Sequence, residues 1–181
     1  MLDSLFRRVR PKRRGACTAP PEDENRPAAV LHASDGATLA YRPDLIVELT
    51  HEHRLLETGF ASLLAAHRSG DVESCIFRLR AFTNLLRAHL LKENLQVYRY
   101  LRHALPSGHE AAARTAALRL EMQEIGRTLN AFTNAYLGAT WNEERRRQLG
   151  RDLSEIGLIL AQRILTEERA LYPLYLPPDR Y

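Results

Sequence analysis

The sequence predicts an all-α protein, an up-down-up-down antiparallel four-helix bundle. Apolar residues recur at alternating steps of three and four along four long segments, which is the pattern of amphipathic helices. Short breaks that contain glycine or proline separate these segments. Helices of roughly 25–33 residues that are joined by turns of a few residues pack as antiparallel neighbours. A short extended piece is expected only at residues 37–41.

The first two helices are expected to meet at a glycine. Pro43 suits the first position of a helix, and Gly70 suits its end. Asp71 would cap the second helix, which must end before Pro106. Their inward-facing stripes are Ile46, Leu49, His53, Leu56, Phe60 and Leu63 in the first helix, and Cys75, Leu79, Phe82, Leu86, His89, Glu93, Val97 and Tyr100 in the second.

The third and fourth helices each follow a capping-box pattern. Ser107 with Glu110 would open the third helix, and Thr140 with Glu143 the fourth. Gly138 should end the third helix, and the fourth should end near Pro173. Their stripes are Leu118, Met122, Ile125, Leu129, Phe132 and Tyr136, and Leu149, Leu153, Ile156, Leu160, Arg163, Glu167, Leu171 and Leu174.

Residues 1–42 differ from the rest and are expected to form a largely disordered basic arm and linker. The bundle would span 43–176, and 177–181 would be a C-terminal tail. Residues 1–14 carry a net charge of +5, whereas the whole chain carries +4. The remaining residues therefore have a net charge of −1. The arm, rather than the bundle, is therefore the part expected to touch an anionic surface, unless it is only a solubilising tail. Its basic residues are Arg7, Arg8, Arg10, Lys12, Arg13 and Arg14.

Polar residues interrupt three of the four stripes at similar depth. They are His53, His89, Glu93, Arg163 and Glu167. A buried polar group is costly unless it is paired or bound to a metal ion. His89 and Glu93 are four residues apart on one helix, so both can reach the same ion. The function of the chain is expected to reside in this cluster.

Three segments resemble the hemerythrin-like HHE family: THEHRLL at 50–56, HLLKENLQVYRYL at 89–101 and RILTEERALYPLY at 163–175. The resemblance implies a hemerythrin-like bundle over about residues 43–176 and iron as the cofactor. It also implies that the metal ligands are His53, His89, Glu93 and Glu167.

The chain departs from that family pattern in its second half. Arg163 stands where the resemblance calls for a histidine, and the third helix offers only Ile125 and Leu129 at the relevant depth. The ligand set is too short for two iron ions, so the site is expected to bind one ion or none. In the metal-free alternative, the guanidinium of Arg163 lies between Glu93 and Glu167 and replaces the charge of the ion.

A second, weaker similarity is to the regulator-of-sigma-D family of anti-sigma factors. It rests on EHRLL, FTNLLRAHLLKENLQVY and LSEIGLILAQRILTEE. This similarity implies a metal-free regulator that binds a transcription-related protein partner.

Several function classes find no support in the sequence. There is no apolar run of ~18 residues that could span a membrane, no signal peptide and no glycine-rich phosphate loop. Cys17 and Cys75 do not suggest a disulfide framework. These absences predict a cytoplasmic protein, and the resemblances imply a bacterial protein that acts in sensing or regulation and not as an enzyme. Oxidase-type chemistry ranks third.

Overall fold

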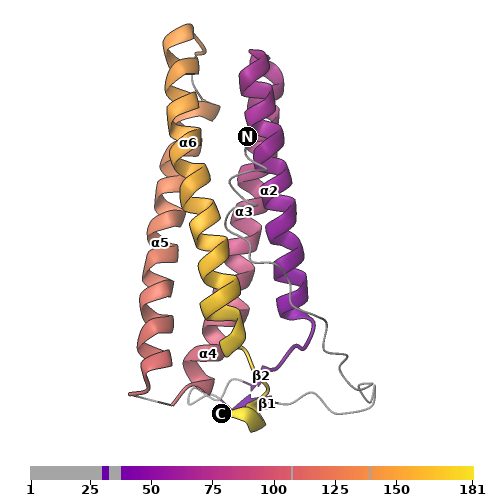
Figure 1. Ribbon diagram of the computed structural model, residues 1–181, viewed down its shortest axis with the longest axis vertical. Coiled ribbons are helices and arrows are strands. Elements are labelled where there is room, and N and C mark those ends of the chain that lie inside the picture. Colours follow the sequence, from indigo (N-terminus) through magenta and orange to yellow (C-terminus); the bar gives the residue numbers. More distant parts are fainter. Residues whose placement is uncertain (1–29, 33–37, 107, 139) are drawn as a thin grey trace.

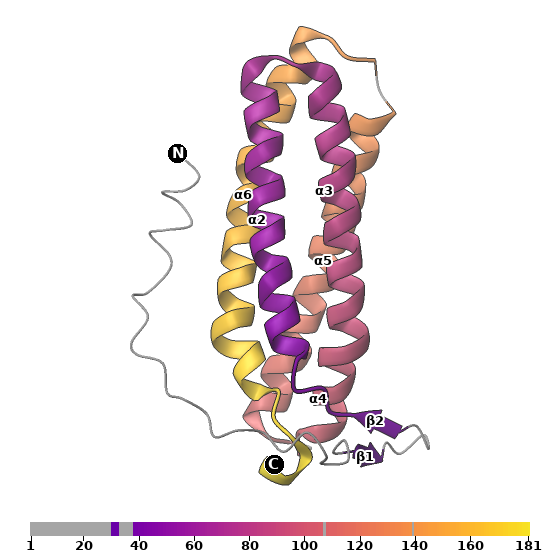
Figure 2. The same cartoon turned by 90° about the vertical axis from the view of Figure 1, so that its right-hand side faces the viewer.

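Four long helices lie alongside one another in the computed structural model (Figures 1 and 2). The structure describes residues 30–32, 38–106, 108–138 and 140–181. The long helices are α2 (Leu45–Ser69), α3 (Val72–Glu93), α5 (Glu110–Leu137) and α6 (Glu143–Thr166). The prediction of an all-α fold with four helices is confirmed. The α2–α3 and α5–α6 connections lie at one end, and α4 and the strands lie at the other (Figure 2).

Two of the helices continue through irregular segments. After α3 come the π-helix η1 (Asn94–Tyr98) and α4 (Arg99–Ala104); after α6 come the π-helix η2 (Glu167–Leu171) and the 3₁₀ helices η3 (Tyr172–Leu174) and η4 (Pro178–Arg180). The expectation that the fourth helical path ends near Pro173 agrees with η3.

A short β-ribbon precedes the bundle. The strands β1 (Val30–His32) and β2 (Thr38–Ala40) pair antiparallel, with Leu31 opposite Leu39. The sequence predicted an extended piece where β2 lies, but it assigned the β1 residues to a linker. The basic residues Arg7, Arg8, Arg10, Lys12, Arg13 and Arg14, and the arm in which they stand, lie outside the described residues.

The helix ends confirm some of the predicted capping and end residues and not others. Asp71 caps α3 by accepting a hydrogen bond of 2.9 Å from the Ser74 amide, and Gly70 ends α2 with φ 75°, a conformation that suits glycine. Three predicted starts are wrong by two or three residues: α2 begins at Leu45, α5 at Glu110 and α6 at Glu143.

Ser107 of the first predicted capping box lies outside the described residues, and Thr140 of the second does not cap α6. Another side chain nearer to the helix accepts the free amide hydrogen. Asn142 accepts a hydrogen bond of 2.8 Å from the Arg145 amide, and His109 accepts one of 3.2 Å from the Ala111 amide.

A polar layer divides the hydrophobic core into two clusters. One cluster includes Phe60 and Phe82, and the other, toward the strands, includes Leu49 and Val97. The predicted stripes are buried except for half-buried Ile46, Ile125 and Leu174. The side chains between the two clusters are the buried polar residues His53, His89, Glu93, Arg163 and Glu167. Their predicted inward orientation is confirmed.

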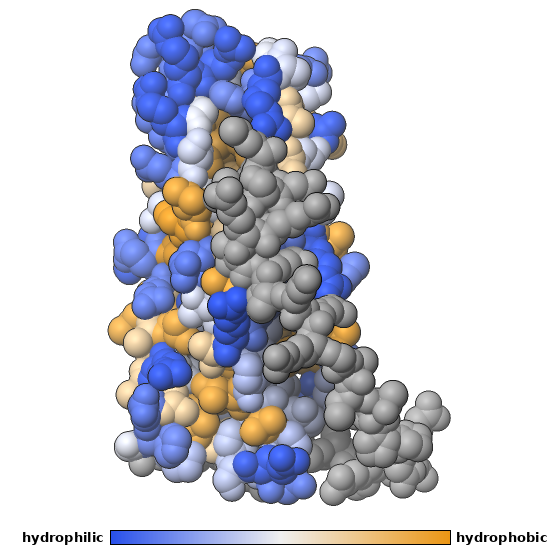
Figure 3. Space-filling model, in the orientation of Figure 1, coloured by the Kyte–Doolittle hydropathy of each residue, from blue (hydrophilic) through white to orange (hydrophobic). Residues whose placement is uncertain are grey.

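The outer surface varies along the bundle. The end at which α6 begins is strongly hydrophilic, and hydrophobic patches lie below it on the same face (Figures 1 and 3). Exposed Leu120, Leu158 and Ile159 are among the apolar residues of α5 and α6. Across the described residues, no helix is both long and apolar enough to cross a membrane.

Candidate metal centre

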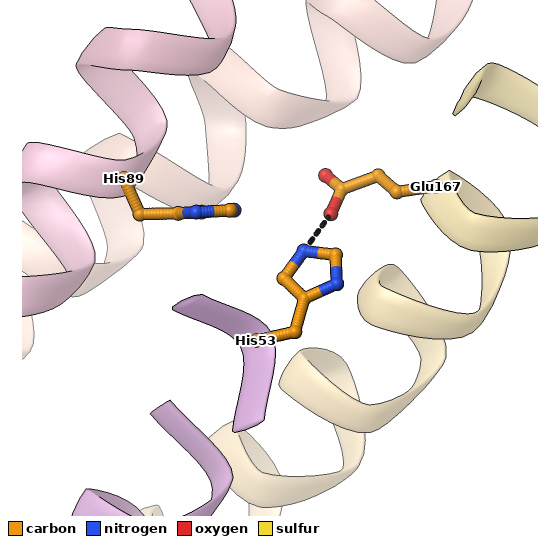
Figure 4. Close-up of side chains that lie close together, drawn as sticks. All are labelled: His53, His89 and Glu167. Atoms are coloured by element: carbon orange, nitrogen blue, oxygen red, sulfur yellow. Dashed lines mark hydrogen bonds and ion pairs between the residues drawn. The ribbon is translucent and has the colours of Figure 1, made fainter. Parts of the chain in front are cut away.

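Three side chains from three elements converge inside the polar layer. His53 comes from α2, His89 from α3 and Glu167 from the first residue of η2, and the three point toward one another (Figure 4). One potential ligand atom from each lies within 4.8 Å of the others. The shortest approach is 3.1 Å, between Nε2 of His53 and Oε2 of Glu167. All three residues are buried.

His53 is held by carboxylates on both sides of its ring. Its Nδ1 lies 3.0 Å from Oε1 of Glu168, and its Nε2 also lies 3.1 Å from the hydroxyl of Tyr172. Burial lowers the pKa of His53, but its bonds to Glu167 and Glu168 outweigh burial and raise that pKa above its ordinary value. Without an ion, both ring nitrogens therefore donate. An ion would take the place of the proton on Nε2.

His89 is oriented by a chain of charges. Its Nδ1 lies 2.9 Å from Oε2 of Glu52, and Lys92 bridges Glu52 and Glu48. Burial and the nearby His53 lower the pKa of His89, so the ring is neutral. The Nδ1–H group of His89 then donates a hydrogen bond to the carboxylate of Glu52, so the free lone pair of the ring is on Nε2. This is the arrangement in which a second carboxylate prepares a histidine to bind a metal ion.

Arg163 occupies the part of the layer nearest to α5. Its Nε donates to Glu167, its Nη2 donates to the hydroxyl of Tyr98, and its Nη1 donates to the Leu118 carbonyl at 3.3 Å. Burial alone would raise the pKa of Glu167, but its bond to His53 and the charge of Arg163 lower it overall. Arg163 thus carries a buried, fully engaged positive charge.

Glu93 does not take part in the expected network. The prediction that Arg163 lies between Glu93 and Glu167 is wrong for Glu93, because the donors of Arg163 are taken by Glu167, Tyr98 and the Leu118 carbonyl. Both carboxyl oxygens of Glu93 are buried without a hydrogen-bond partner. Burial raises the pKa of Glu93 well above its ordinary value; the charge and close approach of Glu167 add to this, while Arg163 and the nearby hydroxyl of Tyr172 oppose it. A bound cation would provide such a carboxyl group with a partner.

Both irregular helical turns coincide with candidate ligands. Glu93 directly precedes η1, and Glu167 is the first residue of η2. A π-turn is rare and is found mostly at functional sites, since it rotates the side chains on either side of it relative to each other. The same irregularity at corresponding depth in two helices indicates that the backbone is adapted to this layer.

Four contributors to the site were not predicted from the sequence: Glu52, Glu168, Tyr98 and Tyr172. Glu52 and Glu168 are the neighbours of His53 and Glu167 in the sequence, and they fall off the core stripes. Their long side chains reach back to the rings from half-buried positions. The signal available in the sequence was that a glutamate directly precedes His53 and another directly follows Glu167.

The residues fit one metal ion but not two. Two imidazoles and a carboxylate already converge, and Glu93 is not among the groups within 4.8 Å of one another. Its buried carboxyl group is nevertheless near enough to Glu167 for the charge of Glu167 to raise the pKa of Glu93. A second ion would have to replace Arg163, which is bonded on all sides, while Ile125 and Leu129 of α5 supply no ligand atom. Glu121 and Glu124 of α5 are exposed.

Comparison with known proteins agrees with this centre. The family model described as the hemerythrin HHE cation-binding domain matches residues 44–175, which include all four long helices and the whole polar layer. Neither the curated proteins nor the solved structures gave a match. The match covers most of the chain, and it confirms the resemblance that the sequence motifs indicated: this chain belongs to the hemerythrin HHE cation-binding domain family.

Proposed function

We propose that the chain is an up-down-up-down hemerythrin-like bundle that binds a single divalent metal ion and acts in sensing or regulation. The observation that carries the proposal is the convergence of His53, His89 and Glu167 within 4.8 Å, beside a buried carboxyl group that has no partner. An ion at this point would satisfy Glu93 and use the lone pair that Glu52 directs onto Nε2 of His89.

The donor chemistry favours iron or zinc. Imidazole with carboxylate suits Fe²⁺ and Zn²⁺, whereas Mg²⁺ and Ca²⁺ prefer oxygen ligands alone. Family membership favours iron between the two. When bound, such an ion supplies Lewis acidity and, in the case of iron, one-electron redox chemistry. The protein orients the ligands and adds charge. Glu52 holds the ring of His89, Glu168 holds the ring of His53, and Arg163 provides a positive charge in addition to that of the ion.

We expect about one metal ion per chain when the protein is produced with iron and purified without chelator. Elemental analysis measures this. Because an ion that binds only the folded state adds about 2.7 kcal/mol at a hundredfold excess over Kd, chelation should lower Tm by about 5–10 °C. His89→Ala should abolish both effects. The control is His51→Ala, since His51 is an exposed histidine of the same bundle. Metal-free protein with a chelator-insensitive Tm would refute the proposal.

Glu52→Gln should weaken metal binding by about 10–100-fold, because it removes the acceptor that orients His89. Glu48→Gln is the matched control. Glu48 contacts Lys92 as Glu52 does, but Glu48 has no contact with His89. Titration of the metal-free variants with Fe²⁺ under anaerobic conditions measures both affinities. Equal affinities in the two variants would show that Glu52 does not prepare His89.

One observation favours the alternative, a metal-free regulator that binds a protein. Arg163, Glu167 and His53 satisfy one another without an ion. In that case capture of partners from a bacterial lysate should recover RNA polymerase or a sigma factor, and the purified protein should contain no metal. Repeated recovery of neither protein would exclude this alternative.

A further inference from the structure

A cavity of about 370 Å³ lies against the metal centre. His53, His89, Arg163 and Glu167 form one wall, and leucine and isoleucine side chains from all four long helices form most of the remainder. The volume falls within the range of small-molecule sites, about 300–1,000 Å³. Its exposed lining residues lie on α5 and α6, so it is a cleft that opens to solvent between these helices and not an enclosed void.

The cavity has a structural origin. The backbones of the long helices pack closely as α2 with α3, α3 with α5 and α2 with α6, while those of α5 and α6 approach each other less closely. Side-chain hydrogen bonds join α5 and α6 between Tyr136 and Asp152 and between Arg163 and the Leu118 carbonyl, and the cavity lies in the stretch between these contacts. Ile125 of α5 is only half-buried although it belongs to the core stripe, and Ile159 of α6 is 42% exposed. Both line the cavity.

The charges of the cavity select against anions. Among the described residues that line it, Arg163 is the one permanent cation, and its donors are bonded to Glu167, Tyr98 and the Leu118 carbonyl. Glu121 and Glu124 also line it, and their side chains are 65% and 68% exposed. Oε2 of Glu121 lies 3.9 Å from Nη1 of Arg163, so Glu121 engages that cation further, and Glu124 is ion-paired with Arg127. An anionic ligand would therefore find no free cation in the cavity and would meet the carboxylate of Glu121 beside Arg163.

We propose that this cavity binds a small, uncharged organic molecule with a mainly hydrocarbon surface, larger than a diatomic gas. The aliphatic lining favours a hydrocarbon surface on the ligand, and the engagement of Arg163 by Glu167 and Glu121 disfavours a negatively charged ligand. Such a ligand would lie against His53 and His89. The inference depends on the cavity alone and goes beyond the proposed ion, so the ligand binds whether or not metal is present.

The test compares two probes that share one scaffold. N-phenyl-1-naphthylamine is neutral, and 1-anilinonaphthalene-8-sulfonate carries one negative charge. With the full chain in chelator, we expect saturable fluorescence enhancement by the neutral probe, with one site per chain. The sulfonate should bind at least tenfold more weakly. Adding metal should leave the neutral probe bound. Equal affinity for both probes, or binding only with metal present, would overturn the proposal.

Variants locate the site. Ile125→Trp fills the cavity, and Ile159→Glu adds a charge at its edge. Each variant should lower the affinity for the neutral probe at least tenfold. Ile159→Glu keeps the test valid if the tryptophan variant does not fold, because Ile159 is partly exposed. Phe77→Ala is the control, since Phe77 is 73% exposed on α3 and does not line the cavity.

The double variant Glu121→Gln and Glu124→Gln should narrow the difference in affinity between the two probes, because it removes both carboxylates from the cavity lining, including the one nearest to Arg163. Unchanged binding of the neutral probe in both Ile125→Trp and Ile159→Glu would show that the probe binds the outer surface instead. The metal content of the same preparations is measured separately. A protein without metal that still binds the neutral probe would therefore refute the proposed function and leave the cavity proposal standing.

Discussion

Replacing Arg163 by methionine should lower the free energy of unfolding of the metal-free protein by about 3–5 kcal/mol, the cost of removing one partner from a buried ion pair. The variant leaves Glu167 as a buried carboxylate whose remaining partner is His53, and it removes the donor to Tyr98. Urea denaturation with chelator present measures the loss. Arg151→Met on the exposed side of α6 is the control and should stay within about 0.5 kcal/mol of the parent.

Metal should reduce the loss caused by Arg163→Met. A bound ion brings positive charge to Glu167, so it partly replaces the guanidinium. The same denaturation series with Fe²⁺ should therefore show a smaller difference between the variant and the parent. A loss below about 1 kcal/mol without metal would contradict the buried pair. An equal loss with and without metal would mean that the ion does not contact Glu167.

Glu93→Gln should have opposite effects on metal binding and on the metal-free fold. It replaces a candidate ligand, and so should weaken metal binding by more than the roughly 10–100-fold expected for Glu52→Gln, which removes a residue that only orients a ligand. In metal-free protein the same change removes a buried carboxyl group that has no hydrogen-bond partner. The amide stays neutral at every pH, so the variant avoids the cost of burying a charge.

The sign of the pH effect follows from the raised pKa of Glu93. Between the ordinary pKa of a glutamate and this raised value, the folded protein holds a proton that the unfolded chain has lost. The contribution of this proton to the free energy of unfolding is thus complete below the ordinary pKa of a glutamate. It is lost as pH rises through the raised pKa of Glu93. The slope reaches about 1.4 kcal/mol per pH unit at most. Glu93→Gln should abolish this decline.

Urea denaturation of metal-free protein between pH 5 and pH 9 measures the difference between Glu93→Gln and the parent. We expect the free energy of unfolding of the variant to increase relative to that of the parent as pH rises. Glu155→Gln, at an exposed position of α6, should follow the parent throughout. A variant that loses stability at all pH values would mean that Glu93 is a paired carboxylate, as the metal-free network first suggested.

Much of the site could be predicted because helical periodicity alone places residues on a face. His53, His89, Glu93, Arg163 and Glu167 are each spaced from apolar neighbours by three or four residues, so their burial follows from the stripes. Periodicity does not say which buried groups touch. The sequence placed Arg163 between two glutamates, whereas the packing of α5 against the layer supplied the Leu118 carbonyl, and η1 supplied Tyr98.

The sequence by itself determined the helices, their inward faces and the depth of the polar layer, because these depend on spacing and on local breaks. Tertiary structure alone decided the two π-turns, the carboxylates that orient His53 and His89, the isolation of Glu93 and the cavity beside the centre. Each of these depends on the distance and rotation between helices. The relative strength of competing contacts across the bundle sets that geometry, and no periodic pattern within one helix encodes it.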